Sequence, residues 1–360
     1  TYGRANFFFH WNFERICPHV CYFHFIPRLI FNIMIIEITP IATYSTYLVT
    51  NGVIDPPQVL GSGVIAGMNM TDRNFNIEYL KTWVGKTETQ EERSCEQPIH
   101  QYYGLLNKEC RPRVGGPMGP MCHYFFFKPK ISHDEIGPDG HPARGAFMPP
   151  VPLPRRMFAG SSIKYEKPLI IGERHKKVAV IEDIALKEGR SGVLVFCKVR
   201  QNFFGKDGGL ALSELQNIVY REDPPKAGSV TVERAIETSS KTVDCAFKKT
   251  ITPDPVMLFR YSSSTLNTHR IHYDRKYALE VEGYPGLVVH GPLAASFLAE
   301  LALEKNPGQS LSTFQFEARA PLYDTSPFQI AGKPTTNGID LWSITPDNRI
   351  STKASATFVN

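Results

Sequence analysis

Two imidazoles and one amide lie within a six-residue segment in the C-terminal half of the chain. Asn267, His269 and His272 belong to this segment, and a glycine-containing loop that ends in His290 and Gly291 leads from it into an apolar stretch. Imidazoles exchange protons near neutral pH, and a backbone N–H at a helix N-terminus can stabilise negative charge that develops on an oxygen. Together these groups suffice to add water to, or remove it from, the double bond of an enoyl thioester.

Each polar residue of this segment has a chemical and a structural interpretation. His272 is the candidate general base, because an imidazole with an ordinary pKa of about 6.5 can take a proton from water attacking carbon 3; the alternative is a histidine that caps the local turn. Asn267 cannot exchange a proton at neutral pH, so it either holds the water through its amide or only shapes the turn. His269 is either a second proton-transfer group or the partner that fixes the tautomer of His272.

Gly291 is the candidate donor to the thioester oxygen. Its backbone N–H would stabilise the enolate-like charge, and the missing side chain would permit close approach of the thioester; a glycine needed only for helix–sheet packing is the alternative. Tyr273, Gly286, His290 and Arg319 are further candidates for substrate contacts. Of these, Arg319 would meet a phosphate of coenzyme A or of a carrier protein, unless it is simply an exposed surface arginine.

The segment after Gly291 predicts a long buried helix followed by strands. Residues 292–302 are apolar on nearly every side, with Pro292 at the start, Lys305 in the last turn and Gly308 at the exit. Such a helix is buried, as if wrapped by a sheet. Extended segments are expected around residues 314–318, 328–330, 341–344 and 354–359.

The N-terminal half has the same kinds of element. A helix is expected over residues 96–106 and a long ordered loop over 111–154. In the C-terminal half, a further helix is expected with Thr252 as its N-cap. Strands are expected at 177–181, 193–199 and 215–220. We therefore predict an α+β fold, a double hot dog with two antiparallel sheets that each wrap a long central helix. The predicted parts are a poorly defined segment 1–74, an N-terminal hot dog 75–221 that is non-catalytic, a linker 222–229 and a catalytic hot dog 230–360.

Composition limits the classes of partner. The net charge is +5 with scattered basic residues, which argues against nucleic-acid binding and suits anionic partners such as coenzyme A or an acyl carrier protein. Seven cysteines at irregular spacings argue for a reducing compartment. The uncharged run 29–36 is shorter than the ~20 apolar residues of a membrane span, so no stable membrane insertion is expected. Scattered arginines in the first 30 residues give a weak mitochondrial-transit character, although an artefact of the gene boundary would explain this segment equally.

Residues 259–293 resemble the MaoC-like hydratases and dehydratases, closest to the mitochondrial 3-hydroxyacyl-thioester dehydratases and mesaconyl-CoA hydratases. In that family a histidine follows an aspartate by five residues, and a His-Gly pair lies 18 and 19 residues further on. His272 follows Asn267 by five residues, and His290 and Gly291 follow His272 by 18 and 19. The chain departs from the pattern where Asn267 replaces the aspartate and His269 replaces an asparagine. Three N-terminal segments carry the likeness further, residues 83–88, 137–142 and 152–160.

The resemblance implies a hydro-lyase that uses no cofactor and no metal and acts on an acyl thioester of coenzyme A or acyl carrier protein. The favoured function is dehydration of 3-hydroxyacyl-carrier-protein in mitochondrial fatty-acid synthesis, and the alternative is hydration of mesaconyl-CoA or itaconyl-CoA. A silent thioester-binding protein is the alternative of another class, because Asn267 is not a carboxylate. The loop residues His123 and 125–127 would line the acyl tunnel. The two hot dogs would form an internal pseudo-dimer, with assembly into homo-oligomers left open.

Overall fold

The computed structural model describes residues 49–50, 53–54, 76–109, 112–189, 192–223 and 243–359. The chain divides into two units, Thr1–Arg73 and Asn74–Asn360. In the first unit, the described residues form a short antiparallel pair, β1 (Val49–Thr50) and β2 (Val53–Ile54). The predictions for the remainder of segment 1–74, and for residues 224–229 of the linker, lie outside the described residues. None of the described helices is long and apolar enough to cross a bilayer.

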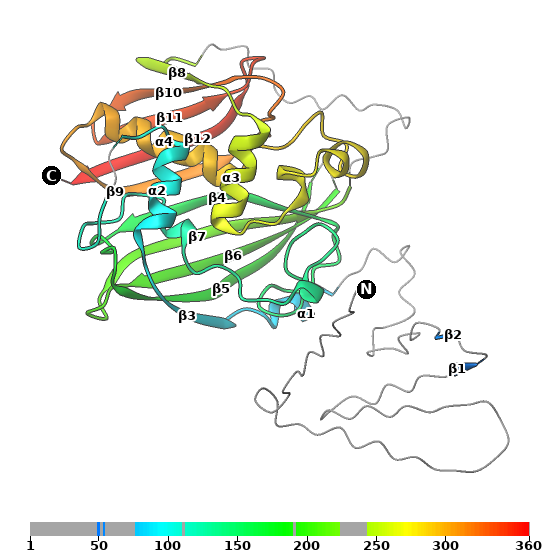
Figure 1. Cartoon of the computed structure of the whole chain (residues 1–360). Helices are drawn as coiled ribbons and strands as arrows, with labels where there is room; N and C mark the ends of the chain where they lie inside the picture. The colour runs from blue at the N-terminus through cyan, green and yellow to red at the C-terminus, as the bar shows by residue number, and fades with distance from the viewer. Residues whose placement is uncertain are drawn as a thin grey trace, which may run out of the picture. The chain divides into compact units, whose positions relative to one another are not determined.

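The second unit is built on one ten-stranded antiparallel sheet in the order β3-β5-β6-β7-β4-β9-β12-β11-β10-β8. Strands from the N-terminal half occupy one side of the sheet and strands from the C-terminal half the other (Figure 1). The predicted strands are confirmed, and most are longer than predicted. Their bounds are β3 Thr87–Arg93, β4 Arg155–Tyr165, β5 Arg174–Gly189, β6 Gly192–Phe204, β7 Leu210–Arg221, β8 Phe247–Ile251, β9 Ser310–Ala318, β10 Phe328–Thr335, β11 Gly338–Ile344 and β12 Ile350–Val359.

The two half-sheets join where β4 pairs with β9. Gly160 lies at this junction opposite Glu317, with a φ of +149°. A Cβ at residue 160 would lie 2.2 Å from the carbonyl oxygen of Phe316. Only glycine permits this close approach of the two backbones, so the junction depends on a single residue type.

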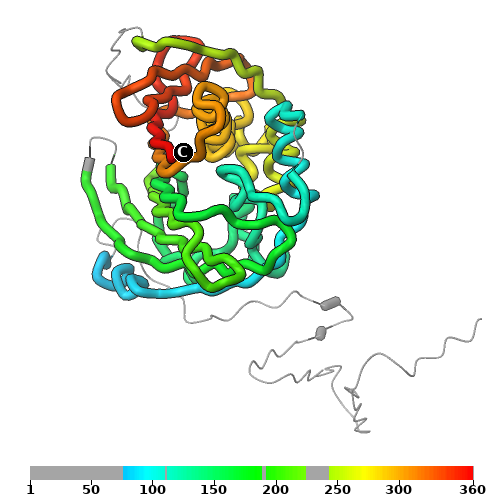
Figure 2. The backbone as a smooth tube through the Cα atoms, turned by 90° about the vertical axis from the view of Figure 1, so that its left-hand side faces the viewer, coloured from blue at the N-terminus to red at the C-terminus, as the bar shows by residue number. Residues whose placement is uncertain are grey.

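The predicted central helix is α4 (Gly291–Lys305), which packs against β4 and the C-terminal strands. The sheet curves round it (Figure 2), and nine of its residues are buried. An antiparallel sheet wrapped around one long buried helix confirms the hot-dog arrangement. The helix begins one residue earlier than predicted, so Pro292 occupies its second position.

The other helices are shorter. They are α1 (Ile77–Lys81), α2 (Glu96–Leu105) and α3 (Pro255–Thr265), and α2 packs against α3. Asp254, not Thr252, caps α3: its carboxylate accepts a hydrogen bond from the backbone N–H of Met257 at 2.7 Å. The prediction was wrong by two residues because both prolines of the segment were assigned to the helix, whereas only Pro255 belongs to it.

The predicted long loop is confirmed over its described residues 112–154, where the regular structure is two one-turn 3-10 helices, Cys122–Phe125 and His133–Glu135. Although irregular, the loop is anchored by buried aromatic side chains: Phe125, Phe126 and Phe127 belong to the same hydrophobic core as α2, α3 and α4. A single core therefore extends across both halves of the unit.

Candidate active site

His272 is held in place between two loops. α3 ends in a left-handed residue, Leu266, and a one-turn 3-10 helix, Arg270–His272, follows it. The imidazole Nδ1 lies 2.7 Å from the carbonyl oxygen of Val288, and the side chain is buried. Because a carbonyl oxygen can only accept, Nδ1 carries the hydrogen and the lone pair of Nε2 remains free to take a proton.

His290 lies directly against His272. The two rings are stacked with centroids 3.7 Å apart, and the Nε2 of His290 is 2.8 Å from the hydroxyl of Ser262. His290 is also the residue that precedes α4, and it is fully buried. The structure therefore places this predicted substrate contact beneath His272, where it fixes the position of the ring.

His269 lies on the other side of the site. Its ring centroid is 5.5 Å from that of His272, and its backbone N–H donates to the side-chain oxygen of Asn267 at 3.2 Å. Asn267 thus forms a side-chain-to-backbone turn, which is the structural role considered for it above.

A histidine–carboxylate pair from the N-terminal half completes this group of side chains. The Nδ1 of His141 is 3.0 Å from a carboxylate oxygen of Asp139, and the backbone N–H of His141 donates to the other oxygen at 2.9 Å. The ring of His141 lies 4.1 Å, centroid to centroid, from that of His269. We call Asp139, His141, His269 and His272 the histidine cluster. Of these, Asp139 and His141 were not among the predicted site residues.

Backbone contacts dock the loop that carries Asp139 and His141. The backbone N–H of Arg270 donates to the carbonyl of Asp139 at 2.9 Å, and the Arg270 guanidinium donates to the carbonyl of Pro138 at 3.1 Å. Thr268 donates its hydroxyl to the carbonyl of Gly140. Gly140 has a φ of +88°, and a Cβ there would lie 1.9 Å from the carbonyl oxygen of Thr268. The sequence signal was a glycine between an aspartate and a histidine in an ordered loop.

Burial keeps the imidazoles of the cluster neutral at pH 7. It lowers the pKa of His272 to about 4 and, together with the charge of Arg156, lowers the pKa of His141 to about 4. It also lowers the pKa of His269 to about 2, with help from the two neighbouring imidazoles. Burial alone would raise the pKa of Asp139, but hydrogen bonds from His141 outweigh it and hold that pKa well below its usual range. The cluster is therefore a set of proton acceptors beside one ionised carboxylate.

The donor atoms of Asp139, His141 and His269 lie within 4.8 Å of one another. A divalent cation can be held by such a set. Here the Nδ1 of His141 and the carboxylate of Asp139 already bond to each other, which favours an acid/base cluster over a cation site.

Gly291 is the first residue of α4, whose N-terminus presents free backbone N–H groups and a partial positive charge. A Cβ at Gly291 would have its nearest neighbour, a ring carbon of Phe158, at 3.8 Å. That is an ordinary contact distance, so packing does not require a glycine at this position. The role of Gly291 as a donor to the thioester oxygen therefore stays a prediction that packing does not replace.

The remaining predicted substrate contacts lie at the edge of the site or outside it. Tyr273 is 42% exposed and donates its hydroxyl to the carbonyl of Thr268 at 3.0 Å. Gly286 packs closely against Thr325 and Asp324. Arg319 is exposed and ion-paired with Glu317 at 3.1 Å, and no contact joins it to the histidine cluster among the described residues.

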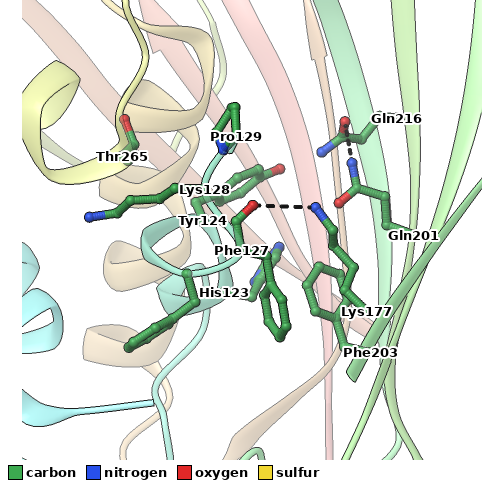
Figure 3. Close-up of a pocket in the computed structure, with 11 residues that line it drawn as sticks. His123, Tyr124, Phe127, Lys128, Pro129, Lys177, Gln201, Phe203, Gln216 and Thr265 are labelled. Carbon is green, nitrogen blue, oxygen red and sulfur yellow. Dashed lines mark hydrogen bonds between the residues drawn. The ribbon is translucent and has the colours of Figure 1, made fainter. Parts of the chain in front are cut away.

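A pocket of about 130 Å³ opens between the aromatic loop and the N-terminal strands (Figure 3). His123, Phe126 and Phe127 are among the residues that line it, and Phe125 is not; their place in an acyl tunnel stays a prediction. Its polar wall includes Lys177, which donates to the carbonyl of Phe127 at 3.4 Å. The other lining residues are Tyr124, Lys128, Pro129, Gln201, Phe203, Gln216 and Thr265.

The histidine cluster thus lies in a hot-dog fold, where His272 stacks on His290, the residue that precedes α4. The family model described as hydroxyacyl-thioester dehydratase type 2 matches residues 121–324, more than half of the chain. The chain belongs to this family and is a hydro-lyase of acyl thioesters.

Two relatives differ in how closely they match. The chain is 41% identical over 276 residues to mesaconyl-C(4)-CoA hydratase of Chloroflexus aurantiacus, which covers 76% of this chain and 95% of that protein. It is 24% identical over 247 residues to the mitochondrial hydroxyacyl-thioester dehydratase type 2 of Schizosaccharomyces pombe, which covers 62% of this chain and 79% of that protein.

Solved structures show the same fold at low sequence identity. A MaoC-like dehydratase from Phytophthora capsici matches with a TM-score of 0.57 at 11% identity, over 79% of this chain and 98% of that one. HtdX of Mycobacterium tuberculosis matches with a TM-score of 0.54 at 16% identity, over 76% of this chain and 100% of that one.

Proposed function

We propose that this hydro-lyase acts on a short acyl-CoA whose enoyl group carries a carboxylate, as the mesaconyl group does. The observation that carries the proposal is the position of Arg156. This residue lies on β4 opposite Tyr220, and its charge contributes to lowering the pKa values of both His141 and His269. A half-buried cation beside the histidine cluster suits a substrate with a second negative group.

The two neighbouring arginines, Arg155 and Arg144, have partners within the fold. Arg155 is ion-paired with Asp223 at 2.8 Å and with Glu282 at 3.3 Å. Arg144 donates to the backbone carbonyls of Val151 and Leu153. Arg156 has no carboxylate within ion-pair distance among the residues that the structure describes.

The chemistry of the substrate agrees with this position. In a mesaconyl thioester bonded through carbon 4, the free carboxylate is attached to the carbon that receives the hydroxyl. A cation that binds it therefore lies within a few ångströms of the attacking water, which is where the histidine cluster is. The 41% relative that matches over 95% of its length is named for this substrate, which supports the dicarboxylate reading over the straight-chain one.

The reaction needs only proton transfer. In the hydration direction, water loses a proton to the histidine cluster, where His272 is the predicted base, while its oxygen bonds to the carbon beta to the thioester. The electron pair of the double bond moves to the alpha carbon and the thioester oxygen, and the Gly291 N–H stabilises that charge. The cluster then returns the proton to the alpha carbon. One H and one OH have been added, and dehydration follows the same path in reverse.

The test compares substrates and variants. Purified protein should hydrate mesaconyl-C4-CoA with a higher kcat/KM than crotonyl-CoA or hexenoyl-CoA, followed by loss of the ultraviolet absorbance of the conjugated thioester. Arg156→Gln should lower kcat/KM for the carboxylate substrate by ~10²-fold, the value of one charge-assisted contact, and leave crotonyl-CoA within about threefold. Lys164→Gln, which removes an exposed cation from the same strand, is the control. Equal losses on both substrates would contradict a role in carboxylate recognition.

A straight-chain substrate on acyl carrier protein is the second candidate. It is favoured by the aromatic pocket of Figure 3 and by the names of the two yeast relatives, which are also called mitochondrial. Rates that rise with acyl length and exceed those for mesaconyl-C4-CoA would select it. This candidate function implies a mitochondrial location, which subcellular fractionation of the tagged protein tests.

A further inference from the structure

Asn267 leaves the site without the carboxylate that the resemblance implies at that position. The side chain of Asn267 is used in a local turn, where its oxygen accepts from the N–H of His269. Within the histidine cluster, the ionised group is Asp139, which comes from the other half of the chain. The ionised carboxylate of the cluster is thus at residue 139 and not at residue 267.

We propose that Asp139 and His141 replace the absent aspartate: His141 shares the proton of the attacking water with His272, and Asp139 stabilises the imidazolium that forms. This inference rests on the hydro-lyase chemistry proposed above. It assigns His141 as a catalytic residue and Asp139 as a positioning residue that acts through it.

The hydrogen-bond pattern supports this division of work. Asp139 holds the Nδ1 of His141 at 3.0 Å, so Nε2 is the nitrogen left for proton transfer. His272 is held the same way, but by a neutral backbone carbonyl at 2.7 Å. An imidazolium at His141 therefore faces a full negative charge, whereas one at His272 faces only a dipole. Asp139 therefore favours a proton on His141 and opposes the effect of the nearby Arg156 and Arg144 charges.

The proton balance is closed. The O–H bond of water breaks as its oxygen bonds to carbon 3, and the proton, which His272 and His141 share, passes to the Nε2 of His141. The electron pair of the double bond moves to carbon 2, which then takes the same proton from His141. The carboxylate of Asp139 remains ionised throughout, and no oxidant, reductant or co-reactant is needed.

The docking of the loop shows that the pair is built into the site. Three contacts fix it to residues 268–270: the Arg270 N–H and guanidinium bond to the carbonyls of Asp139 and Pro138, and Thr268 bonds to Gly140. Gly140 cannot be replaced without a clash with Thr268. The loop therefore presents Asp139 and His141 in one orientation, which acid/base catalysis requires.

The first experiment measures hydration by the full chain with Asp139→Asn and, separately, His141→Gln. Each should lower kcat by ~10²-fold and leave the Kd of the saturated analogue butyryl-CoA within about twofold of the parent. Asp134→Asn, which removes an exposed carboxylate from the same loop, is the matched control. A kcat within about threefold of the parent in both variants would overturn the proposal.

A second readout separates charge from structure. Asp139 raises the pKa values of His141 and His269, whereas Arg156 lowers both, Arg144 lowers that of His141, and the imidazoles of His141 and His272 lower that of His269. Removing the Asp139 charge should therefore move the acid limb of kcat/KM to lower pH. An unchanged limb with a lower plateau would indicate a merely structural role and overturn the proposal.

The third readout is rescue. Adding Asn267→Asp to Asp139→Asn returns a carboxylate to the position of the family's aspartate and should restore kcat at least ~10-fold. A double variant as slow as Asp139→Asn alone would overturn the exchange of one carboxylate for the other. Assays with and without a chelator are included, because activity lost on chelation would assign these residues to a metal instead. If the parent protein hydrates no thioester, the proposed function is wrong. If the parent hydrates a thioester and the Asp139 and His141 variants do so at the same rate, only this inference is wrong.

Discussion

The same irregular loop contributes to two histidine–carboxylate pairs in two regions of the molecule: it supplies both members of one pair and only the histidine of the other, whose carboxylate lies on β7. Asp139 and His141, 3.0 Å apart, have side chains that are 20% and 19% exposed. His123 and Glu214, 3.2 Å apart, are 3% and 0% exposed. The first pair lies in the histidine cluster beside α4, and the second lies beneath the N-terminal half of the sheet, where His123 lines the pocket of Figure 3.

The number of partners separates the two pairs. Glu214 also accepts from the hydroxyls of Ser161, at 2.6 Å, and Tyr124, so its lone pairs are used within the core. Asp139 serves mainly His141, whose second nitrogen is left for other contacts. A fully buried and saturated network specifies structure, whereas a pair with a free nitrogen at an accessible edge can do chemistry. Residue types alone therefore do not identify a catalytic pair.

The largest effect should come from His272→Ala, which removes the predicted base. We expect kcat for enoyl-thioester hydration to fall by ~10³-fold, while butyryl-CoA still binds. His133→Ala removes an exposed histidine of the loop and is the control. A His272→Ala variant that keeps a tenth or more of the parent rate would move the chemistry out of the histidine cluster, and loss of butyryl-CoA binding would make the residue a binding one.

The second prediction concerns the buried pair. Glu214→Gln leaves His123 without its carboxylate, so the free energy of unfolding should fall by ~3 kcal/mol at pH 7, while kcat of the folded protein stays within about twofold. The network holds the pKa of Glu214 below its ordinary value although burial opposes this. Glu214 therefore stabilises the fold above its unfolded pKa of about 4.3, and this stability is lost as the pH falls through the lower folded pKa.

Urea unfolding at pH 7 and pH 4 measures both parts of that prediction, with Asp139→Asn as the counterpart. Asp139→Asn should cost less than about 1 kcal/mol of stability, because its pair is partly exposed, yet should slow the reaction. If Glu214→Gln slowed the reaction as much as Asp139→Asn did, the distinction between the two pairs would collapse.

Gly291→Ala gives a smaller effect that isolates ligand approach from packing. The added methyl group meets its nearest neighbour, Phe158, at 3.8 Å, so the melting temperature should stay within about 2 °C of the parent. The same methyl group would stand beside the N–H that faces the thioester oxygen, and kcat/KM should fall by ~10-fold. If Gly291→Ala unfolded the protein but left kcat/KM of the remaining folded protein unchanged, Gly291 would be needed for helix–sheet packing and not for ligand approach.

Local sequence patterns predicted the parts of the site that are close in the chain. The spacing of Asn267, His272 and Gly291 was predicted from the family resemblance, and the apolar run that becomes α4 from helix periodicity. Asp139 and His141 could not be placed this way, because their contact with the cluster spans 128 residues, as between Gly140 and Thr268, and depends on tertiary hydrogen bonds. The continuous sheet was missed for a similar reason, since the pairing of β4 with β9 leaves no local signal apart from Gly160.

The smallest expected change is in the pH dependence of kcat/KM of the parent enzyme. It tests which of the two histidine–carboxylate pairs takes part in the reaction. An exposed histidine base with a pKa of about 6.5 would lose ~10-fold in kcat/KM between pH 8 and pH 5.5. Burial lowers the pKa values of His272 and His141 to about 4, so these bases stay neutral and kcat/KM should change by less than about twofold over that range.

The same shifts carry a cost in stability. Unfolded histidines bind protons between pH 6.5 and about 4, where the buried ones do not, so the free energy of unfolding falls as the pH drops through that window. The profile should therefore be measured by initial rates well below the melting temperature, with circular dichroism at each pH. An acid limb centred near pH 6.5 in a protein that remains folded would place the base on an exposed histidine and remove the buried cluster from proton transfer. A kcat/KM profile that is level in the parent and has an acid limb displaced to lower pH in Asp139→Asn would assign the Asp139–His141 pair to the reaction. The His123–Glu214 pair would then have a structural role only.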